Sequence, residues 1–329
     1  MEFVLEEIMS ESIVLEVRNL TKHFKVGSSG KQVVHAVDNV SFRLAKGKTL
    51  GLVGESGCGK SSCARTIIRI YEPTSGRIIL DGQDITELNQ KALQPVRKKM
   101  QMIFQDPYAS LNARMTVRDI IAEPLVAHHI VKKKDQANDW VYPMLERVGL
   151  TKEHANRYAH EFSGGQRQRV GIARALILQP DLVICDEPIS ALDVSIQAQV
   201  VNLLKDFQEE KGISYLFIAH DLSMVRYVSD DVGVMYLGQL VEICEADEIY
   251  KNPLHPYTKG LLGSIPIANP KLAREKEKSS IEGDIPSPIN PPRGCRFHTR
   301  CPYARPVCSQ EAPEMKEAGP GHMVACHLY

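Results

Sequence analysis

Short runs of apolar and β-branched residues alternate with helical patterns along the first part of the chain. The apolar runs predict strands at Ile13–Val17, Thr49–Val53, Arg77–Leu80, Leu182–Cys185, Tyr215–Ala219 and Val232–Tyr236. Almost every residue of 182–185 and 215–218 is apolar, as expected of strands buried on both faces. Helical patterns follow several of these strands, at Gly59–Ile70, Gly165–Leu178 and Ile196–Glu210. This alternation predicts an α/β fold with a mostly parallel sheet.

Two departures from the alternation indicate the domain organisation. Residues from about 89 to 163 are richer in helical pattern, most clearly at Val117–Leu125 and Asp139–Val148, and predict a helical subdomain inserted in the sheet domain. Twelve of the 19 prolines fall in the last 77 residues, so we place a domain boundary near residue 252. The prediction is a first domain at 1–252 and a small, irregular, cysteine-containing domain at 253–329.

Composition and charge exclude several classes of protein. With 329 residues, 43% of them apolar, the chain can bury a full core. Forty basic and 40 acidic residues give a net charge of zero, which disfavours a protein that coats nucleic acid or anionic lipid. No run approaches the ~18 apolar residues of a membrane span. Met1–Ser10 has three glutamates and no basic residue, unlike a secretory signal, so we expect a reducing cytoplasm and cysteines that are thiols or metal ligands.

The strongest local motif is a phosphate-binding loop. The sequence from Gly54 to Ser61 fits G-x-x-x-x-G-K-[ST], with a predicted strand before it and a predicted helix after it. Its glycines permit the tight turn that aims successive N–H groups at one anion. The predicted ATP-binding residues of this segment are Ser56, Gly57, Cys58, Gly59, Lys60, Ser61 and Ser62. Lys60 is expected to hold β- and γ-phosphate oxygens, and the Ser61 hydroxyl to bind Mg²⁺. The alternative is an ordinary glycine-rich turn.

Two acids end a predicted buried strand at Asp186 and Glu187. Ligands of open α/β sheets bind at the carboxyl ends of the strands. We therefore predict that Asp186 reaches the Mg²⁺ shell and that Glu187 takes a proton from the attacking water. An acidic turn before Pro188 is the alternative.

The string Ser163-Gly-Gly-Gln-Arg167 completes a set of motifs that resembles the ATP-binding cassette (ABC) ATPases, over residues 13 to about 265. The resemblance implies further roles: Phe24 stacks on adenine, Gln105 reaches Mg²⁺ and the attacking water, Asp193 lies in the D-loop and His220 contacts the γ-phosphate. It also implies that Ser163, Gly164, Gly165 and Gln166 form the signature that contacts the ATP of the opposite subunit. The alternative for Phe24 is an ordinary core or surface aromatic residue, and the alternative for His220 is a structural histidine at a strand end.

The signature has a physical basis in the chain itself. Ser163 is placed to cap the next helix, and Gly164–Gly165 expose its first N–H groups, which makes a second anion site. In the ABC ATPases this site serves the nucleotide of the other subunit. Two cassettes are therefore expected to close head to tail over two ATP molecules.

Further segments resemble the dipeptide and oligopeptide permease ATPases. They are Tyr236–Ile243, Asn252–Lys259 and Gly294–Pro302. The resemblance implies an importer at the cytoplasmic face of the membrane, with two transmembrane permease subunits, a second ATPase subunit and an extracytoplasmic peptide-binding protein. Nickel importers are close relatives. One competing hypothesis is an ABC ATPase that acts on DNA or ribosomes. The interval of 103 positions from Lys60 to Ser163 is too short for the long helical arm of the DNA-repair types, the chain has one cassette where translation factors have two, and its charge is neutral. The other is a redox or zinc-binding protein, which would not need Glu187 and His220.

Four cysteines gather near the C-terminus, at Cys295, Cys301, Cys308 and Cys326. Four thiolates can hold either Zn²⁺ or an iron–sulfur cluster, and the gaps of five, six and 17 residues are wider than those of most zinc sites. Spacing leaves zinc, a cluster and free thiols open. The resemblance to the peptide permease ATPases implies a [4Fe–4S] cluster. Cys63, Cys185 and Cys244 are predicted to be core residues.

Overall fold

A computed structural model describes residues 12–27, 32–190, 192–264, 281 and 283–329. Met1–Ser10, which the sequence distinguishes from a secretory signal, lies outside the described residues. The chain divides into two compact units. Unit 1 contains residues 12–15, Arg43–Lys48 and Ile79–Ile218, and unit 2 contains the described parts of Glu16–Phe42, Thr49–Ile78 and Ala219–Tyr329.

Unit 1 is built on three parallel strands in the order β6–β7–β8. These are β6 (Met100–Ile103), β7 (Leu182–Asp186) and β8 (Ser214–Ile218), with Met102 opposite Ile184 and Cys185 opposite Phe217. Every residue of β7 and β8 is buried, which confirms the two-sided burial predicted from their composition. The short strand β5 (Gln83–Asp84) pairs with the end of β4 (Ser75–Leu80).

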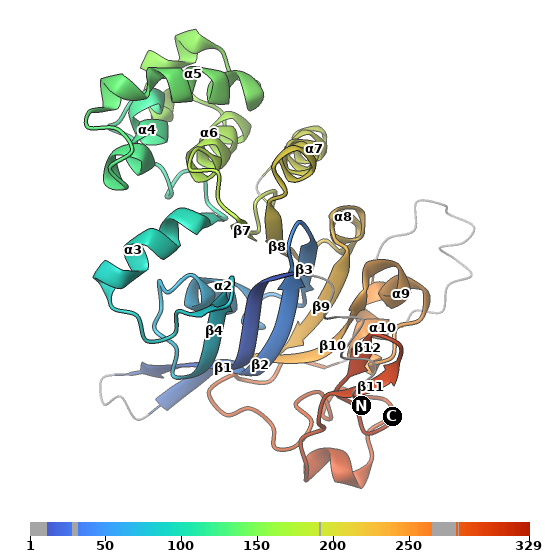
Figure 1. The fold of residues 1–329 in the computed structure, drawn as a ribbon. Coiled ribbons are helices and arrows are strands. Elements are labelled where there is room, and N and C mark those ends of the chain that lie inside the picture. Colours follow the sequence, from blue (N-terminus) through green and yellow to red (C-terminus); the bar gives the residue numbers. More distant parts are fainter. Residues whose placement is uncertain (1–11, 28–31, 191, 265–280, 282) are drawn as a thin grey trace, which may run out of the picture. The chain divides into compact units, whose positions relative to one another are not determined.

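The helices of unit 1 include a cluster between β6 and β7 in the sequence. The unit contains α3 (Gln90–Lys99), α4 (Val117–Ala127), α5 (Asn138–Arg147), α6 (Gly164–Leu176) and α7 (Val194–Lys211), and the short 3₁₀ helices η1 (Lys134–Ala137), η2 (Lys152–Asn156) and η3 (Ala159–Glu161). The helix α4 packs against both α5 and α6 (Figure 1). The predicted helical segment 89–163 also contains β6, which the sequence analysis did not predict and which pairs with β7.

Unit 2 contains a run of strands in the order β3–β9–β10–β12–β11. The strands are β3 (Thr49–Val53), β9 (Asp231–Tyr236), β10 (Gln239–Glu245), β11 (Lys316–Gly319) and β12 (His322–Val324). The pairing of β3 with β9 is parallel and the other pairings are antiparallel. The C-terminal region is thus more regular than its proline content predicts, because β12 pairs with β10 and β11 pairs with β12.

The remaining elements of unit 2 lie before, between and after these strands in the sequence. They include most of the long strands β1 (Ile13–Val26) and β2 (Gln32–Ala45), the helices α2 (Lys60–Ile67), α8 (Leu222–Val228), α9 (Ala246–Lys251) and α10 (Pro256–Gly263), and the 3₁₀ helix η4 (Pro306–Ser309). Cys63, Cys185 and Cys244 are buried, as predicted. Among the described residues, no helix is both long and apolar enough to cross a membrane.

Candidate functional site

The phosphate loop lies in unit 2, between the buried strand β3 and α2. Its shape depends on glycine, because Gly57 and Gly59 have φ angles of 78° and 106°, which side chains disfavour. A Cβ atom at Gly59 would lie 2.0 Å from the carbonyl oxygen of Ala36. Gly59 is the N-cap of α2 and provides no side-chain cap. The positive end of the helix dipole is thus set for an anion from outside the helix.

Lys60 begins α2 with only 4% of its surface exposed. Its Nζ donates to the carbonyl oxygens of Gly54 at 2.7 Å and Glu55 at 3.1 Å, and lies 3.6 Å from the Cys58 sulfur. A buried ammonium that has carbonyl partners can exchange one of them for a phosphate oxygen, with which it makes a stronger, charge-assisted bond.

Two residues distant in sequence hold Glu55 in the loop. The Tyr257 hydroxyl accepts a hydrogen bond from the Glu55 N–H at 2.8 Å. Arg300, 5% exposed, forms a two-pronged ion pair with the Glu55 carboxylate, at 2.8 and 3.1 Å. This geometry is the strong form of the arginine–carboxylate interaction. The sequence analysis did not predict either contact, although both residues lie in segments that resemble the peptide permease ATPases.

The other predicted residues of unit 2 are Phe24 and His220. Phe24 is half-buried on β1, with its ring edge-on to Tyr71 at 5.1 Å and the Lys22 ammonium 4.8 Å from its centroid. His220 is exposed. Both side chains are therefore accessible to a ligand in unit 2.

Glu187 and Gln105 meet in unit 1. The Gln105 Nε2 donates to the Glu187 carboxylate at 2.7 Å, although 82 positions separate the two residues. Glu187 has a φ of 48°, a left-handed conformation that is rare outside glycine. Such strain often accompanies functional residues because the fold must hold them in place. The preceding Asp186 ends β7 and is fully buried.

The signature begins α6 as predicted. Ser163 is the N-cap, and its hydroxyl accepts from the Gln166 N–H at 3.4 Å while the Gln166 side chain accepts from the Ser163 N–H at 3.1 Å. This reciprocal capping box fixes the start of the helix. A Cβ atom at Gly165 would lie 3.0 Å from the Ile196 side chain, whereas a Cβ atom at Gly164 would lie 3.6 Å from the Tyr108 hydroxyl, its nearest neighbour.

Asp193 is the N-cap residue of α7. Its side chain makes no capping hydrogen bond, and it is exposed to solvent. The carboxylate is thus open to solvent at the start of the helix. Ala191, in the same predicted D-loop segment, lies outside the described residues.

The four C-terminal cysteines of unit 2 influence one another electrostatically. The pKa of the Cys295 thiol is raised to about 11, mainly by burial and to a smaller extent by the nearby thiols of Cys326, Cys308 and Cys301. Burial also raises the pKa values of Cys301 and Cys326, and each of these is raised further by the Cys308 thiol. The four thiols are therefore close enough to influence one another's titration.

Backbone N–H groups point at these sulfur atoms. The amides of Phe297, Tyr303 and Leu328 lower the pKa of Cys295, Cys301 and Cys326, respectively, against the larger effect of burial. The Arg305 N–H donates to the Cys308 sulfur at 3.4 Å. Hydrogen bonds to sulfur stabilise thiolates in metal–sulfur sites.

The neighbouring histidines have other partners. His298 donates to the Cys295 carbonyl oxygen at 2.8 Å, His327 to the Glu311 carbonyl oxygen at 2.9 Å, and His322 pairs with Glu242 at 2.7 Å. These contacts occupy one ring nitrogen of each histidine, whereas the four thiols influence one another electrostatically.

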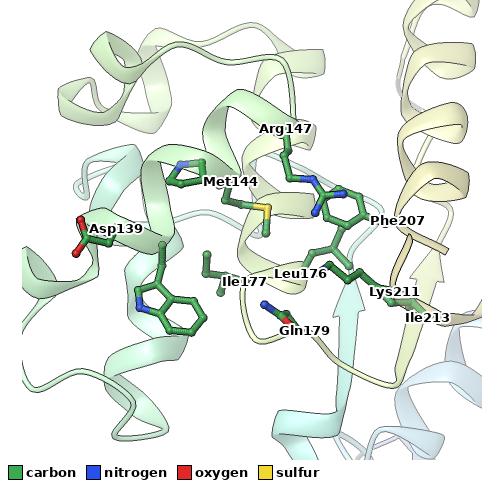
Figure 2. A pocket seen from close by; sticks show the side chains of 11 residues that line it. Asp139, Met144, Arg147, Leu176, Ile177, Gln179, Phe207, Lys211 and Ile213 are labelled. Carbon is green, nitrogen blue, oxygen red and sulfur yellow. The ribbon is translucent and has the colours of Figure 1, made fainter. Parts of the chain in front are cut away.

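A separate cavity in unit 1 is formed by α5 and the ends of α6 and α7 (Figure 2). Met144, Leu176 and Phe207 make up much of its apolar lining, and the Arg147 guanidinium stacks on the Phe207 ring with 4.0 Å to the centroid. None of the residues predicted to bind ATP lines it. This cavity is therefore distinct from the predicted nucleotide site.

Comparison with known proteins agrees with this description. The family described as ABC transporter matches residues 37–190, and the family described as oligopeptide/dipeptide transporter, C-terminal region, matches residues 241–308. The dimeric ATP-binding cassette MJ0796 in a post-hydrolysis state with ADP and Pi has a TM-score of 0.65 and 26% identity, covering 70% of this chain and 98% of that one. These matches confirm the ABC-type P-loop fold.

Curated relatives match almost the whole chain. The oligopeptide transport ATP-binding protein AppF of Bacillus subtilis (strain 168) is 55% identical over 97% of this chain and 98% of its own length. OppF of Salmonella typhimurium is 52% identical over 97% of both chains, and OppF of Escherichia coli K12 is 51% identical over 95% of this chain and 96% of its own. The chain belongs to the oligopeptide transport ATP-binding proteins, a family of ABC transporter ATPases.

Proposed function

We propose that this chain is the ATP-hydrolysing subunit of an importer that moves dipeptides or oligopeptides across the cytoplasmic membrane. The observation that carries the proposal is the Gln105–Glu187 hydrogen bond of 2.7 Å, which aims a carboxylate for proton transfer in a chain that also has a phosphate loop and a signature helix. The peptide substrate is supported by relatives that are named for oligopeptide transport and match at least 95% of the chain.

Each residue then has a separate task in hydrolysis. Residues 56–62 bind the phosphates, with Lys60 moving from its carbonyl partners to phosphate oxygens, and Phe24 stacks on the adenine. Glu187 accepts the proton of the attacking water, while His220 contacts the γ-phosphate. Holding water and phosphate in one orientation lowers the barrier in addition to the proton transfer.

The donor set of the predicted magnesium site fits a hard cation. It consists of the Ser61 hydroxyl, the Asp186 carboxylate and the amide oxygen of Gln105, and Mg²⁺ prefers such oxygen ligands. The Gln105 amide nitrogen donates to Glu187, so its oxygen is the atom left for the metal. When bound, Mg²⁺ neutralises charge on the β- and γ-phosphates.

The signature implies that two subunits share each ATP. Ser163, Gly164, Gly165 and Gln166 present a capped helix N-terminus suited to the γ-phosphate of a nucleotide on the opposite cassette. Asp193, exposed at the start of α7, belongs to the same contact between subunits. ATP then favours the closed dimer and hydrolysis releases it, which converts chemistry into motion.

The partners follow from this mechanism. A second ABC ATPase subunit, identical or not, completes the two ATP sites, and two transmembrane permease subunits receive the motion at the cytoplasmic face. An extracytoplasmic peptide-binding protein delivers the substrate, and nucleic acid has no part.

Purification from membranes tests these partners. The full chain, carrying an affinity tag, is isolated from detergent-solubilised membranes of its own organism, with an untagged strain as the control. We expect two polytopic membrane proteins and an ABC ATPase to co-purify. Recovery of ribosomes or DNA in place of membrane proteins would contradict the proposal.

We also propose that the four C-terminal cysteines hold one [4Fe–4S] cluster. Tetrahedral Zn²⁺, with Zn–S bonds of about 2.3 Å, would require sulfur atoms about 3.8 Å apart. In the described part of the chain, no three of these sulfur atoms lie within 4.8 Å of one another. Their wider separation supports the larger cluster, and the N–H groups aimed at them would stabilise thiolates in a metal–sulfur site of either kind. Its role would be structural, fixing loops that have little apolar core.

Iron and sulfide analysis tests the cluster. The chain is purified without oxygen. We expect about four iron atoms and four acid-labile sulfides per chain, and an absorbance band at about 400 nm. Replacing Cys295, Cys301, Cys308 or Cys326 with Ser should reduce all three signals. Cys63→Ala is the matched control because Cys63 is buried elsewhere, and burial raises its pKa to about 12. One zinc ion without sulfide, or no metal at all, would overturn this assignment.

A further inference from the structure

His23 on β1 and two residues of β2, His35 and Asp38, form a compact cluster in unit 2. One ligand atom from each of the three lies within 4.8 Å of the other two. The imidazole rings are 4.2 Å apart and inclined at 55°. The side chains are 25%, 30% and 24% exposed, respectively, so the cluster lies near the protein surface.

The nitrogen atoms of this cluster face the carboxylate without hydrogen bonds. The His23 Nε2 lies 3.5 Å from one Asp38 oxygen, and the His35 Nδ1 lies 3.6 Å from the other. Both nitrogen atoms are buried and have no hydrogen-bond partner among the described residues. Buried polar atoms nearly always have a partner, so two such atoms facing one carboxylate require an explanation.

A metal ion provides a partner for both nitrogen atoms. Zinc lies about 2.0–2.2 Å from nitrogen and oxygen ligands, which places the ligands of a tetrahedral ion about 3.4 Å apart. The His23 nitrogen is 3.5 Å from one Asp38 oxygen and the His35 nitrogen is 3.6 Å from the other, so each nitrogen is near this spacing from one carboxylate oxygen. Two imidazoles and one carboxylate suit a divalent first-row transition metal, whereas Mg²⁺ prefers oxygen alone.

Arg296 positions the carboxylate. Its guanidinium is 8% exposed and pairs with Asp38, while its other nitrogen donates to the Leu237 carbonyl oxygen. A hydrogen-bonded carboxylate is better oriented for a metal. The positive charge of Arg296 also opposes a cation, so we expect weaker binding than at a structural site with four ligands.

We propose that His23, His35 and Asp38 bind one divalent transition-metal ion, with the remaining coordination position open to water. None of the three residues is among the predicted ATP-binding residues or the four C-terminal cysteines. Because His23 directly precedes Phe24, a bound ion would also restrain the part of β1 that carries the predicted adenine contact.

Zinc binding by chelator-treated, nucleotide-free full chain tests the proposal. Thiols freed by the chelator can take up added zinc, so the four C-terminal cysteines are kept intact in every protein and the readout is the difference between wild type and each variant. His35→Gln and Asp38→Asn should each lower the stoichiometry by one ion, or weaken that ion's binding at least about 10-fold. His128→Gln, a half-buried histidine of unit 1, is the control and should bind as wild type does. Equal zinc binding by all four proteins would overturn the proposal.

A second measurement needs no variant. Wild-type protein is treated with diethyl pyrocarbonate with and without Zn²⁺, and acylation of each histidine is read by mass spectrometry. We expect Zn²⁺ to slow the acylation of His23 and His35 and to leave that of His128 unchanged. Equal acylation of His23 and His35 in the two conditions would contradict the site, even if a variant failed to fold.

Discussion

Glu187→Gln is expected to slow ATP hydrolysis by about 10²–10⁴-fold, the range for losing a general base. Glutamine has the same shape and can still contact Gln105, but it does not accept the proton of the attacking water. ATP binding should persist, because the residues that hold the phosphates are unchanged. The variant should therefore accumulate as an ATP-bound dimer.

The backbone conformation at Glu187 affects the wild-type protein and the Glu187→Gln variant equally. Its φ of 48° strains glutamate and glutamine alike, so the substitution changes the chemistry and leaves the strain. Hydrolysis is measured as phosphate release, and dimerisation by sedimentation with ATP and Mg²⁺. Glu209→Gln, an exposed glutamate on α7, is the control and should hydrolyse normally. Wild-type turnover by Glu187→Gln would refute the assignment of the base.

Lys60→Ala should weaken ATP binding by roughly 10²-fold or more. Losing two charge-assisted hydrogen bonds of about 1.5–3 kcal/mol each accounts for this size. The variant also loses the bonds from Nζ to the carbonyl oxygens of Gly54 and Glu55, which help to shape the loop.

Titration calorimetry with Mg-ATP measures the effect. Lys46→Ala is the matched control, because Lys46 is a surface lysine whose partner is Asp81 at 2.6 Å. We expect its dissociation constant for ATP to equal that of wild type. An unchanged constant for Lys60→Ala would count against the phosphate-loop assignment.

The local pattern of the sequence predicts much of the fold. The five residues of β3 and the burial of β7 and β8 follow from continuous apolar runs. In contrast, β6 was missed because it has four residues, one of them a glutamine, within a segment of helical pattern. Its partner β7 begins about 80 positions later, so only tertiary pairing makes these residues a strand.

The site divides in the same way. The phosphate loop and the signature cap are local, and their glycines and Ser163 can be recognised from spacing alone. Contacts between distant segments cannot be: Arg300 reaches Glu55 across 245 positions. The sequence spacing of His23, His35 and Asp38 also matches no known motif, because their proximity depends on how β1 and β2 are paired. Long-range pairing of side chains is the information that the sequence pattern lacks.

Peptide uptake by living cells tests the central claim most directly. The gene is deleted in its own organism, and uptake of a labelled oligopeptide and of a labelled free amino acid is measured. We predict that the deletion abolishes oligopeptide uptake and spares the amino acid, and that wild type restores uptake while Glu187→Gln does not. Undiminished oligopeptide uptake after deletion, or full restoration by Glu187→Gln, would contradict the account.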